Sequence, residues 1–309
     1  MPRALVVVLL LVLGLLAGCA GSSPSADRPV AYLAAPPALG HPPVEPVQKL
    51  LVVVEENHSL AQMRRRMPYT FSLARRYGYA GDYHALGHPS LPNYLGITSG
   101  HMYGVHRNMK PSLLKVGSPS VFGQALAAGR TAGVYVDSMP TPCFRRRQAP
   151  YTLPANPWVF YSRERSACLA HDRPMAAFAP DVSAGRLPQV GMVTPNLCHS
   201  GHDCPLSTAD AWFERLMSTV TSGPDWRSGR LAIVLTADED HHNAGNVVLT
   251  TVIHPSQSHH VVSARLTHYS LTRLFDEVAG LPPLGQAATA PSMAKAFGLP
   301  LSAPVHAAG

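Results

Sequence analysis

Runs of apolar and polar residues along the chain predict strands that alternate with helices. Continuous apolar, β-branched runs are typical of strands buried on both faces. Such runs occupy residues 50–54, 131–136, 190–193, 231–235 and 247–253. Segments with a helical pattern precede or follow them, at 59–77, 120–128, 208–221 and 268–279. This alternation predicts an α/β fold with a largely parallel sheet.

Three segments show no apolar period. Residues 20–46 are rich in Ala, Pro, Ser and Gly, which indicates a flexible tether. Residues 140–188 are rich in Pro and Arg, and we expect long loops there. A catalytic domain is therefore predicted at 47–284, and an Ala- and Pro-rich C-terminal tail at 285–309 is expected to be only partly ordered.

The chain begins with an apolar stretch that is too short for an ordinary membrane span. This stretch, residues 4–18, suits the core of a signal peptide, which we predict at 1–18. It ends in a Leu-Ala-Gly-Cys sequence that resembles the bacterial lipobox, in which the cysteine is lipid-modified after cleavage. We therefore expect an exported lipoprotein held at a membrane surface through Cys19, with 19–46 as its tether. The alternative is a secreted protein whose plain signal is cut near Ala20.

Composition and charge narrow the function classes. The 309 residues are 46% hydrophobic and 14% charged, which excludes a collagen, a coiled coil and a fully disordered chain. The formal charge of +7 suits anionic substrates or a membrane surface. Short basic clusters such as 64–66 and 145–147 are not interleaved with aromatic residues, so we expect no nucleic-acid partner.

The cysteines fit an exported protein, because export permits disulfide bonds. With Cys19 set aside, four cysteines remain, and these permit three pairings. Closeness in the sequence favours the pairs Cys143–Cys168 and Cys198–Cys204. A metal site built from these cysteines is disfavoured, because the sequence contains no C-x-x-C motif.

Polar residues of metal-binding type follow three of the predicted strands. They are Glu55-Glu56-Asn57-His58 after the first strand, Asn196, His199, His202 and Asp203 after the strand at 190–193, and Asp238-Glu239-Asp240-His241-His242 after the strand at 231–235. The carboxyl ends of parallel strands share one edge, where ligands of open α/β sheets bind. Carboxylates gathered there repel one another, and a divalent cation would relieve that cost. Oxygen ligands suit Ca, Mg or Mn, whereas histidines suit Zn or Fe, so the identity of the metal stays open.

A further polar motif, His88-Pro89-Ser90-Leu91-Pro92-Asn93-Tyr94, lies between a short predicted strand at 81–85 and a helix that runs to Thr98. Ser90 would therefore sit near a helix N-terminus. Backbone N–H groups and the helix dipole there favour an anion, and would help a serine alkoxide or bind a phosphate. Taken alone, the motif fits a serine that merely caps the helix.

Five motifs in this order resemble a bacterial phosphoesterase family that contains acid phosphatases and phospholipases C. The motifs are Val54-Glu55-Glu56-Asn57-His58-Ser59, His88-Pro89-Ser90-x-Pro92-Asn93-Tyr94, Thr194-Pro195-Asn196 with His202-Asp203, Thr236-Ala237-Asp238-Glu239-Asp240 and Thr267-His268-Tyr269-Ser270. The resemblance covers residues 49–284 and implies an alkaline-phosphatase-like fold, with a central, mostly parallel sheet flanked by helices. It also implies a divalent metal ion and a phosphorylated small molecule or a phosphoinositide as substrate.

The resemblance assigns roles to individual residues. The implied metal ligands are Glu56, Asn57, Asp238 and Glu239. Ser90 would be the nucleophile beside the metal, and His202, Asp203 and His268 would contact phosphate, transfer protons or support the site. Asn93 and His88 would bind the substrate. These roles predict that phosphate monoesters are hydrolysed through a phosphoserine intermediate.

Two positions depart from the family's pattern. Ala237 stands where many relatives have tryptophan, which predicts a more open pocket wall. Cys204 stands where relatives often have glycine, and a bond to Cys198 would either fix or displace the loop that carries His202 and Asp203.

Two other functions remain as alternatives. A phospholipase C-type phosphodiesterase shares the fold and the acidic motifs, although the chain is short for that branch. A non-catalytic solute-binding lipoprotein would fit the export signal, the tether and the α/β body. It would not need a serine and carboxylates at the strand ends.

Overall fold

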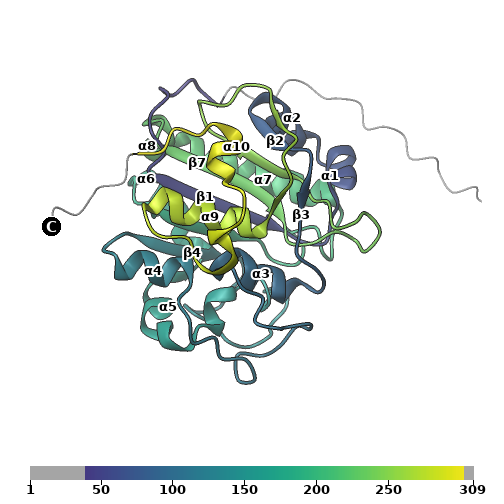
Figure 1. The fold of residues 1–309 in the computed structure, drawn as a ribbon, viewed down its shortest axis with the longest axis vertical. Coiled ribbons are helices and arrows are strands. Elements are labelled where there is room, and N and C mark those ends of the chain that lie inside the picture. Colours follow the sequence, from purple (N-terminus) through teal and green to yellow (C-terminus); the bar gives the residue numbers. More distant parts are fainter. Residues whose placement is uncertain (1–38, 303–309) are drawn as a thin grey trace, which may run out of the picture.

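A computed structural model of the protein describes residues 39–302 (Figure 1). Its centre is an eight-stranded sheet with the order β5-β4-β6-β1-β7-β8-β2-β9. The strands are β1 (Lys49–Glu55), β2 (Gly78–Ala80), β4 (Ala132–Val136), β5 (Asp172–Pro174), β6 (Val190–Thr194), β7 (Leu231–Ala237), β8 (Thr250–Ile253) and β9 (His260–Val262). A separate two-stranded sheet pairs β3 (Tyr83–His84) with β10 (Leu266–Thr267).

The sheet is mostly parallel, as the sequence predicts. β5, β4, β6, β1 and β7 all run parallel, and only β8 runs antiparallel to its neighbours β7 and β2. Every residue of β4, β6 and β7 is buried. Their continuous apolar runs therefore reflect a sheet covered on both faces.

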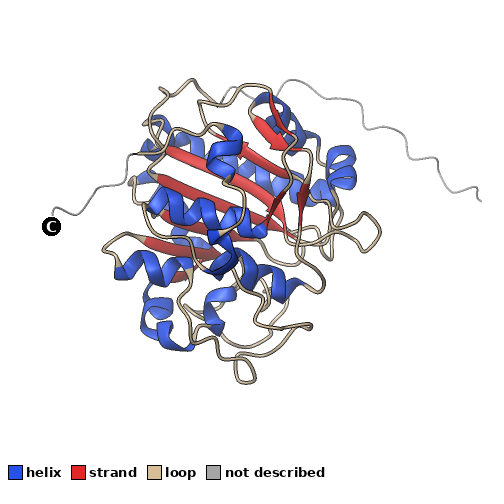
Figure 2. Cartoon of the chain, in the orientation of Figure 1, coloured by secondary structure: helices blue, strands red, loops and turns tan. Residues whose placement is uncertain are grey.

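Helices cover both faces of the sheet (Figure 2). They are α1 (Leu60–Arg66), α2 (Pro68–Arg76), α3 (Ser90–Ser99), α4 (Val121–Ala127), α5 (Arg165–His171), α6 (Phe178–Ser183), α7 (Leu206–Ser222), α8 (Pro224–Arg227), α9 (His268–Ala279) and α10 (Met293–Phe297). Among the described residues, no helix is long and apolar enough to cross a membrane. The predicted signal peptide and Cys19 lie outside the described residues.

The helix predicted at 59–77 is divided into α1 and α2. Ser59 caps α1 through a reciprocal hydrogen-bond pair with Gln62, which is the expected N-terminal signal. Pro68 then occupies the first position of α2. A proline has no backbone N–H and cannot continue the helix before it, so the chain starts a new helix there.

The segment 140–188 is not the set of long loops that its composition suggests. It contains α5, β5 and α6, together with short 3-10 turns at Pro157–Phe160, Ser162–Glu164 and Met175–Ala177. Elements this short give no readable apolar period, so the sequence pattern missed them. Both predicted disulfides are present, and Cys143–Cys168 connects this segment to itself.

Residues 285–302 of the predicted C-terminal tail fold onto the body, and residues 303–309 lie outside the described residues. A 3-10 turn at Gly285–Ala288 and α10 follow the predicted boundary at 284. Phe297 is buried, and the backbone N–H of Val47 donates to the Pro300 carbonyl at 2.7 Å. The tail therefore packs beside Val47, two residues before β1 begins.

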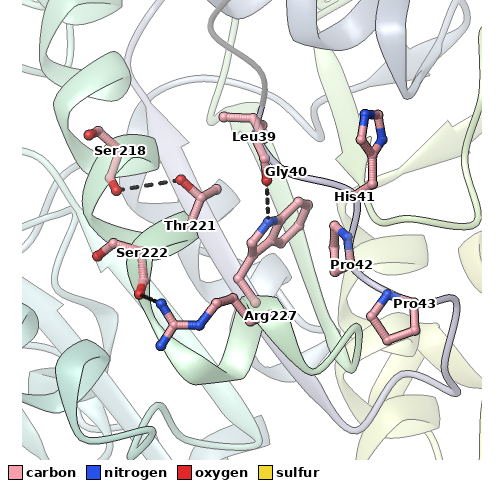
Figure 3. A pocket seen from close by; sticks show the side chains of 10 residues that line it. Leu39, Gly40, His41, Pro42, Pro43, Ser218, Thr221, Ser222 and Arg227 are labelled. Carbon is pink, nitrogen blue, oxygen red and sulfur yellow. Dashed lines mark hydrogen bonds between the residues drawn. The ribbon is translucent and has the colours of Figure 1, made fainter.

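Residues 39–43 of the predicted tether lie against the body rather than apart from it. The indole N–H of Trp226 donates to the Leu39 carbonyl at 2.8 Å, and Leu39 itself is buried. A cavity of about 500 Å³ lies between this segment and the Ser218–Arg227 end of α7 and α8 (Figure 3). It lies at the end of the sheet where β1 and β7 begin, away from their carboxyl ends.

Candidate active site

Parallel pairing of β1 with β7 brings two acidic loops together. Glu55 lies opposite Ala237 in the register, so the residues that follow the two strands leave the sheet side by side. The backbone N–H of Asn57 donates to Asp238 Oδ1 at 3.0 Å, with Asn57 in the left-handed region at φ 60°. Asparagine tolerates that conformation better than most residues. The four expected metal ligands thus lie at one edge of the sheet.

Ser90 is the first residue of α3 and faces this acidic cluster. Its Oγ lies 3.4 Å from Glu56 Oε2, and the side chain is buried. The N-cap residue of α3 is Pro89, which has no capping side chain, and Asn108 Oδ1 accepts the backbone N–H of Leu91 in the first turn. The hydroxyl of Ser90 is therefore not used for capping, and points to the carboxylates from the positive end of a buried helix.

Two residues one turn along α3 hold the carboxylates in place. The Tyr94 hydroxyl donates to Glu56 Oε1 at 2.8 Å, and Asn93 Nδ2 donates to Glu239 Oε2 at 3.1 Å. The Asn93 amide also bonds the backbone of Leu86 and Gly87. Asn93 is fully buried and both its polar atoms are engaged, so it does not suit the substrate-binding role expected from the sequence.

His88 lies between two acidic side chains. Its Nδ1 is 3.3 Å from Glu239 Oε2 and its Nε2 is 3.2 Å from Asp240 Oδ1. The ring also stacks on His242, with centroids 3.9 Å apart. Asp240 in turn accepts backbone N–H bonds from His242, Ala244 and Asn246, so it shapes the loop that carries Glu239.

The electrostatics of the cluster are unfavourable without a cation. Burial, together with the charges of Asp238 and Glu239, raises the pKa of Glu56 well above its ordinary value. Burial also raises the pKa of Asp238 to about 6 and, with the neighbouring Asp238 and Asp240 charges, that of Glu239 to about 9. These shifts, caused first by burial and second by neighbouring charges, mark carboxylates that are costly to ionise together without a positive charge nearby.

The oxygens of the cluster suit a divalent metal ion. Asn57 Oδ1 and Asp238 Oδ2 are buried and have no hydrogen-bond partner. Orphaned buried oxygens beside two further carboxylates are the ligands that hard divalent cations prefer. A different group, Cys143, Cys168 and Asp172, also brings potential ligand atoms together within residues 39–302. Its two sulfurs form a disulfide, so it is not a comparable candidate.

The loop after β6 brings a histidine to the rim of the site. His202 Nδ1 lies 2.6 Å from Asp203 Oδ1, and both side chains are partly exposed. The backbone N–H of Glu56 donates to the Ser200 carbonyl at 3.0 Å, so the loop that carries His202 runs beside the acidic cluster. The Cys198–Cys204 disulfide closes this loop.

His268 occupies a different position from the one expected of a catalytic histidine. It is fully buried at the start of α9, with Nε2 2.7 Å from the Asp238 carbonyl and Nδ1 3.0 Å from the Tyr83 hydroxyl. Burial lowers its pKa to about 4. Because both ring nitrogens are engaged, His268 supports the backbone at Asp238 and has no free nitrogen for substrate.

The structure adds residues that the sequence did not assign. Tyr94 carries a weak signal, since it lies four residues after Ser90 and therefore on the same helix face. His58 bonds the Gly201 carbonyl at 2.9 Å, and His199 bonds Asp137 at 2.5 Å. Those partners are 143 and 62 residues away, so no local pattern could reveal them. Ala237, which stands where many relatives have tryptophan, is fully buried at the end of β7.

A mostly parallel sheet flanked by helices, with carboxylates, an amide and a helix-terminal serine at one edge, has the architecture of the alkaline phosphatase fold. A solved protein of the alkaline phosphatase superfamily from Vibrio parahaemolyticus shares this fold, with a TM-score of 0.55 and 9% identity over 88% of this chain and 76% of that one. The phosphoesterase family model matches residues 61–281, and the chain belongs to this family. It is accordingly a hydrolase that acts on phosphoric esters.

Two curated relatives are similar along the sequence. A phosphatidylinositol-3-phosphatase of Mycobacterium tuberculosis is 28% identical over 304 residues, which cover 96% of this chain and 94% of the relative. A phosphate-repressible acid phosphatase of Penicillium chrysogenum is 24% identical over 220 residues, 66% of this chain. This chain matches about half of the length of the fungal protein, at 52%.

Proposed function

We propose that the protein is an exported, metal-dependent phosphatase that hydrolyses phosphate monoesters through a phosphoserine at Ser90. The observation that carries this proposal is the position of the Ser90 hydroxyl. It lies at the N-terminus of α3, 3.4 Å from Glu56 Oε2, beside buried oxygens that have no hydrogen-bond partner. A nucleophile, an anion-binding helix end and a cation site therefore adjoin.

A divalent cation held by Glu56, Asn57, Asp238 and Glu239 would polarise a phosphoryl oxygen and favour the ionised form of the serine. The chain supplies the remaining chemistry. The Ser90 oxygen attacks phosphorus in line with the leaving alcohol, and Glu56 Oε2, 3.4 Å from the hydroxyl, can accept its proton. The backbone N–H of Ser90 and the positive end of the α3 dipole stabilise the negative charge that grows on the phosphoryl oxygens, whereas the Leu91 N–H already donates to Asn108.

His202 is our candidate for protonating the leaving alcohol. Its ring is oriented by Asp203 and is partly exposed, so it can reach a substrate that enters from solvent. Water must then cleave the phosphoserine, and the same histidine can accept the proton of that water. His268 takes no part in these proton transfers, because its nitrogens are already bonded.

The substrate class is argued from a relative, and the location from the disulfide bonds. The mycobacterial relative is named for phosphatidylinositol 3-phosphate, and the similarity covers nearly the whole chain, so a phosphoinositide is our preferred substrate. Two disulfides suit an oxidising compartment and therefore export. We retain the lipid anchor at Cys19 as part of the proposal, with secretion as its alternative.

The test is phosphate release from an aryl phosphate, a phosphoinositide, a sugar phosphate and a nucleotide, each with and without a chelator. We expect turnover that the chelator abolishes and that added Mg²⁺ or Mn²⁺ restores. Release of the phosphorylated headgroup from a choline phospholipid, without turnover of the aryl phosphate, would instead identify a phosphodiesterase.

Replacing Ser90 tests the phosphoserine directly. We expect Ser90→Ala to lower kcat for the aryl phosphate by more than about 100-fold, because a lost nucleophile usually costs at least this much. Metal affinity should change little. Ser99→Ala, a buried serine at the other end of α3, is the matched control and should keep most of the activity. If Ser90→Ala keeps more than about a hundredth of the rate, the phosphoserine mechanism is wrong.

A further inference from the structure

The positive charge of the chain is concentrated in one segment. Residues 101–173, here called the cationic segment, contain ten Lys and Arg residues but only three Asp and Glu residues. This surplus of seven equals the formal charge of the whole chain, +7, so the rest of the sequence is balanced. α4, β4 and α5 with their connecting loops form the lower part of the molecule in Figure 1.

The cations of this segment face solvent and the acids do not. Eight of its ten Lys and Arg residues are exposed, whereas none of its three acidic residues is. Glu164 is held by Ser120 and Trp158, and Asp172 by Asn156. The exposed cations are Arg107, Lys110, Lys115, Arg145, Arg146, Arg147, Arg163 and Arg165. Within residues 39–302, no ion pair engages any of them.

The cationic segment adjoins the active site. Asn108, next to Arg107, accepts the backbone N–H of Leu91 at 3.0 Å, immediately after Ser90. Arg145 donates to the Pro111 carbonyl at 3.1 Å, which ties the arginine triplet to the same loop. The cations therefore continue from the triplet toward the entrance of the site, where they would attract anions.

Apolar side chains are exposed on the same segment. Leu113 is 71% exposed and Leu169 is 48% exposed. Leu169 borders a surface cavity of about 440 Å³ together with Arg145, Arg146 and Arg165. Exposed leucines among unpaired cations are disfavoured for a surface that only meets water, but suit the boundary between lipid headgroups and acyl chains.

We propose that the cationic segment docks the enzyme onto an anionic lipid membrane, independently of any anchor at Cys19. The arginines contact lipid phosphates and carboxylates, and Leu113 and Leu169 enter the headgroup region. Docking in this way would present phosphate esters carried by the membrane to Ser90. That consequence rests on the proposed function, whereas the docking itself does not.

The experiment is co-sedimentation of the full chain with vesicles, in a Cys19→Ser background that excludes lipid modification. Vesicles contain phosphatidylcholine alone or phosphatidylcholine with phosphatidylserine. We expect binding only to the anionic vesicles, weakened by salt. The triple variant Arg145→Gln, Arg146→Gln, Arg147→Gln should bind at least about tenfold more weakly, because each cation at an anionic surface contributes about 1 kcal/mol.

The matched control removes three exposed arginines elsewhere. Arg215→Gln, Arg227→Gln, Arg230→Gln has the same change in charge, but lies on α7, α8 and the loop before β7. It should bind anionic vesicles like the parent chain. Equal loss in both triple variants, or equal binding to both kinds of vesicle, would overturn the proposal. So would displacement from the vesicles by a single-stranded RNA at low concentration.

Turnover separates this proposal from the proposed function. The triple variant of 145–147 should hydrolyse a soluble aryl phosphate at the parent rate, while its KM for a phosphoinositide in anionic vesicles rises. Vesicle binding needs no turnover. A parent chain that binds vesicles but hydrolyses nothing would contradict the proposed function and leave the docking surface supported.

Discussion

Tyr94 illustrates how a residue without catalytic chemistry positions the site. Its hydroxyl donates to Glu56 Oε1 at 2.8 Å, and both groups are buried. We expect Tyr94→Phe to weaken Mn²⁺ binding by about tenfold, because partners that orient a metal ligand typically contribute this much. Isothermal titration with Mn²⁺ measures the affinity.

A second tyrosine provides the control for this substitution. Tyr103 also donates through its hydroxyl, to Ser99, but is exposed and does not contact Glu56. Tyr103→Phe should leave the Mn²⁺ affinity unchanged. If Tyr94→Phe and the parent chain bind Mn²⁺ with equal affinity, the hydrogen bond from Tyr94 does not orient Glu56 for metal binding.

For individual residues, the sequence predicts which side chains lie at the candidate site better than it predicts what each of them does there. The acidic pairs could be found because each follows an apolar run, and strand order then brings them together. Ser90 could be found because its motif stands at the start of a predicted helix. The substrate-binding role expected of Asn93 does not match its position, and of the roles expected of His268 only support of the site does. Both are fully buried with their polar atoms engaged, and burial of an individual side chain is not visible in a local pattern.

Asp276 on α9, which lies outside the active site, should make the stability of the fold depend on pH. Burial raises its pKa from 3.8 to about 7, although it accepts the Leu284 N–H at 2.9 Å. The folded state therefore binds a proton that the unfolded state releases, and stability falls as pH rises from about 4 to about 7. Asp276→Asn keeps the acceptor but carries no charge.

We therefore expect Asp276→Asn to gain stability relative to the parent chain as pH rises. The difference in free energy of unfolding should grow between about pH 4 and pH 7 and then stay constant. Urea unfolding followed by fluorescence at a series of pH values measures it. A difference that is the same at pH 4 and pH 8 would contradict the raised pKa.

At the scale of elements, the two disulfides should have separable effects. Cys143–Cys168 joins two residues that are 25 positions apart in the sequence. Cys198–Cys204 joins residues only 6 positions apart, in the loop that carries His202. The chain-entropy model assigns about 3.5 kcal/mol to the first and about 2.4 kcal/mol to the second. Only the second holds a candidate catalytic group.

Serine pairs test this difference. We expect Cys143→Ser with Cys168→Ser to lower the free energy of unfolding more, and Cys198→Ser with Cys204→Ser to lower kcat more. Denaturant unfolding and aryl phosphate turnover are measured on both variants at a temperature where both are folded. Full kcat in the 198/204 variant would mean that the staple does not hold His202 for catalysis.

Element length decides which elements the sequence could predict. The long apolar runs of β1 and β7 lie within a residue or two of their predicted positions, because a strand buried on both faces needs an unbroken apolar run. β5 has only three residues and ends at Pro174, on the edge of the sheet. A run so short carries no period, so the sequence suggested a loop instead.

At the scale of the whole molecule, the domain boundary expected at 284 follows composition rather than packing. Residues 285–302 are rich in Ala and Pro, yet Ala287, Met293 and Phe297 are buried against the core. Composition reports the mean character of a segment, whereas a few large side chains at the right positions are sufficient to dock it. Gln257 Nε2 adds a hydrogen bond to the Phe297 carbonyl at 2.9 Å.

The substitution Phe297→Ala measures how much this tail contributes to the fold. Its ring is 1% exposed and lies edge-on to His260, so truncation leaves a cavity in the core. We expect the free energy of unfolding to fall by about 3–5 kcal/mol, the usual cost of removing a buried phenylalanine. Lys295→Ala on the same helix is exposed and should cost less than about 0.5 kcal/mol. Urea unfolding measures both variants. A loss below about 1 kcal/mol for Phe297→Ala would mean that the folded body ends at 284, because removing the largest buried side chain of a docked helix destabilises a protein by more than this.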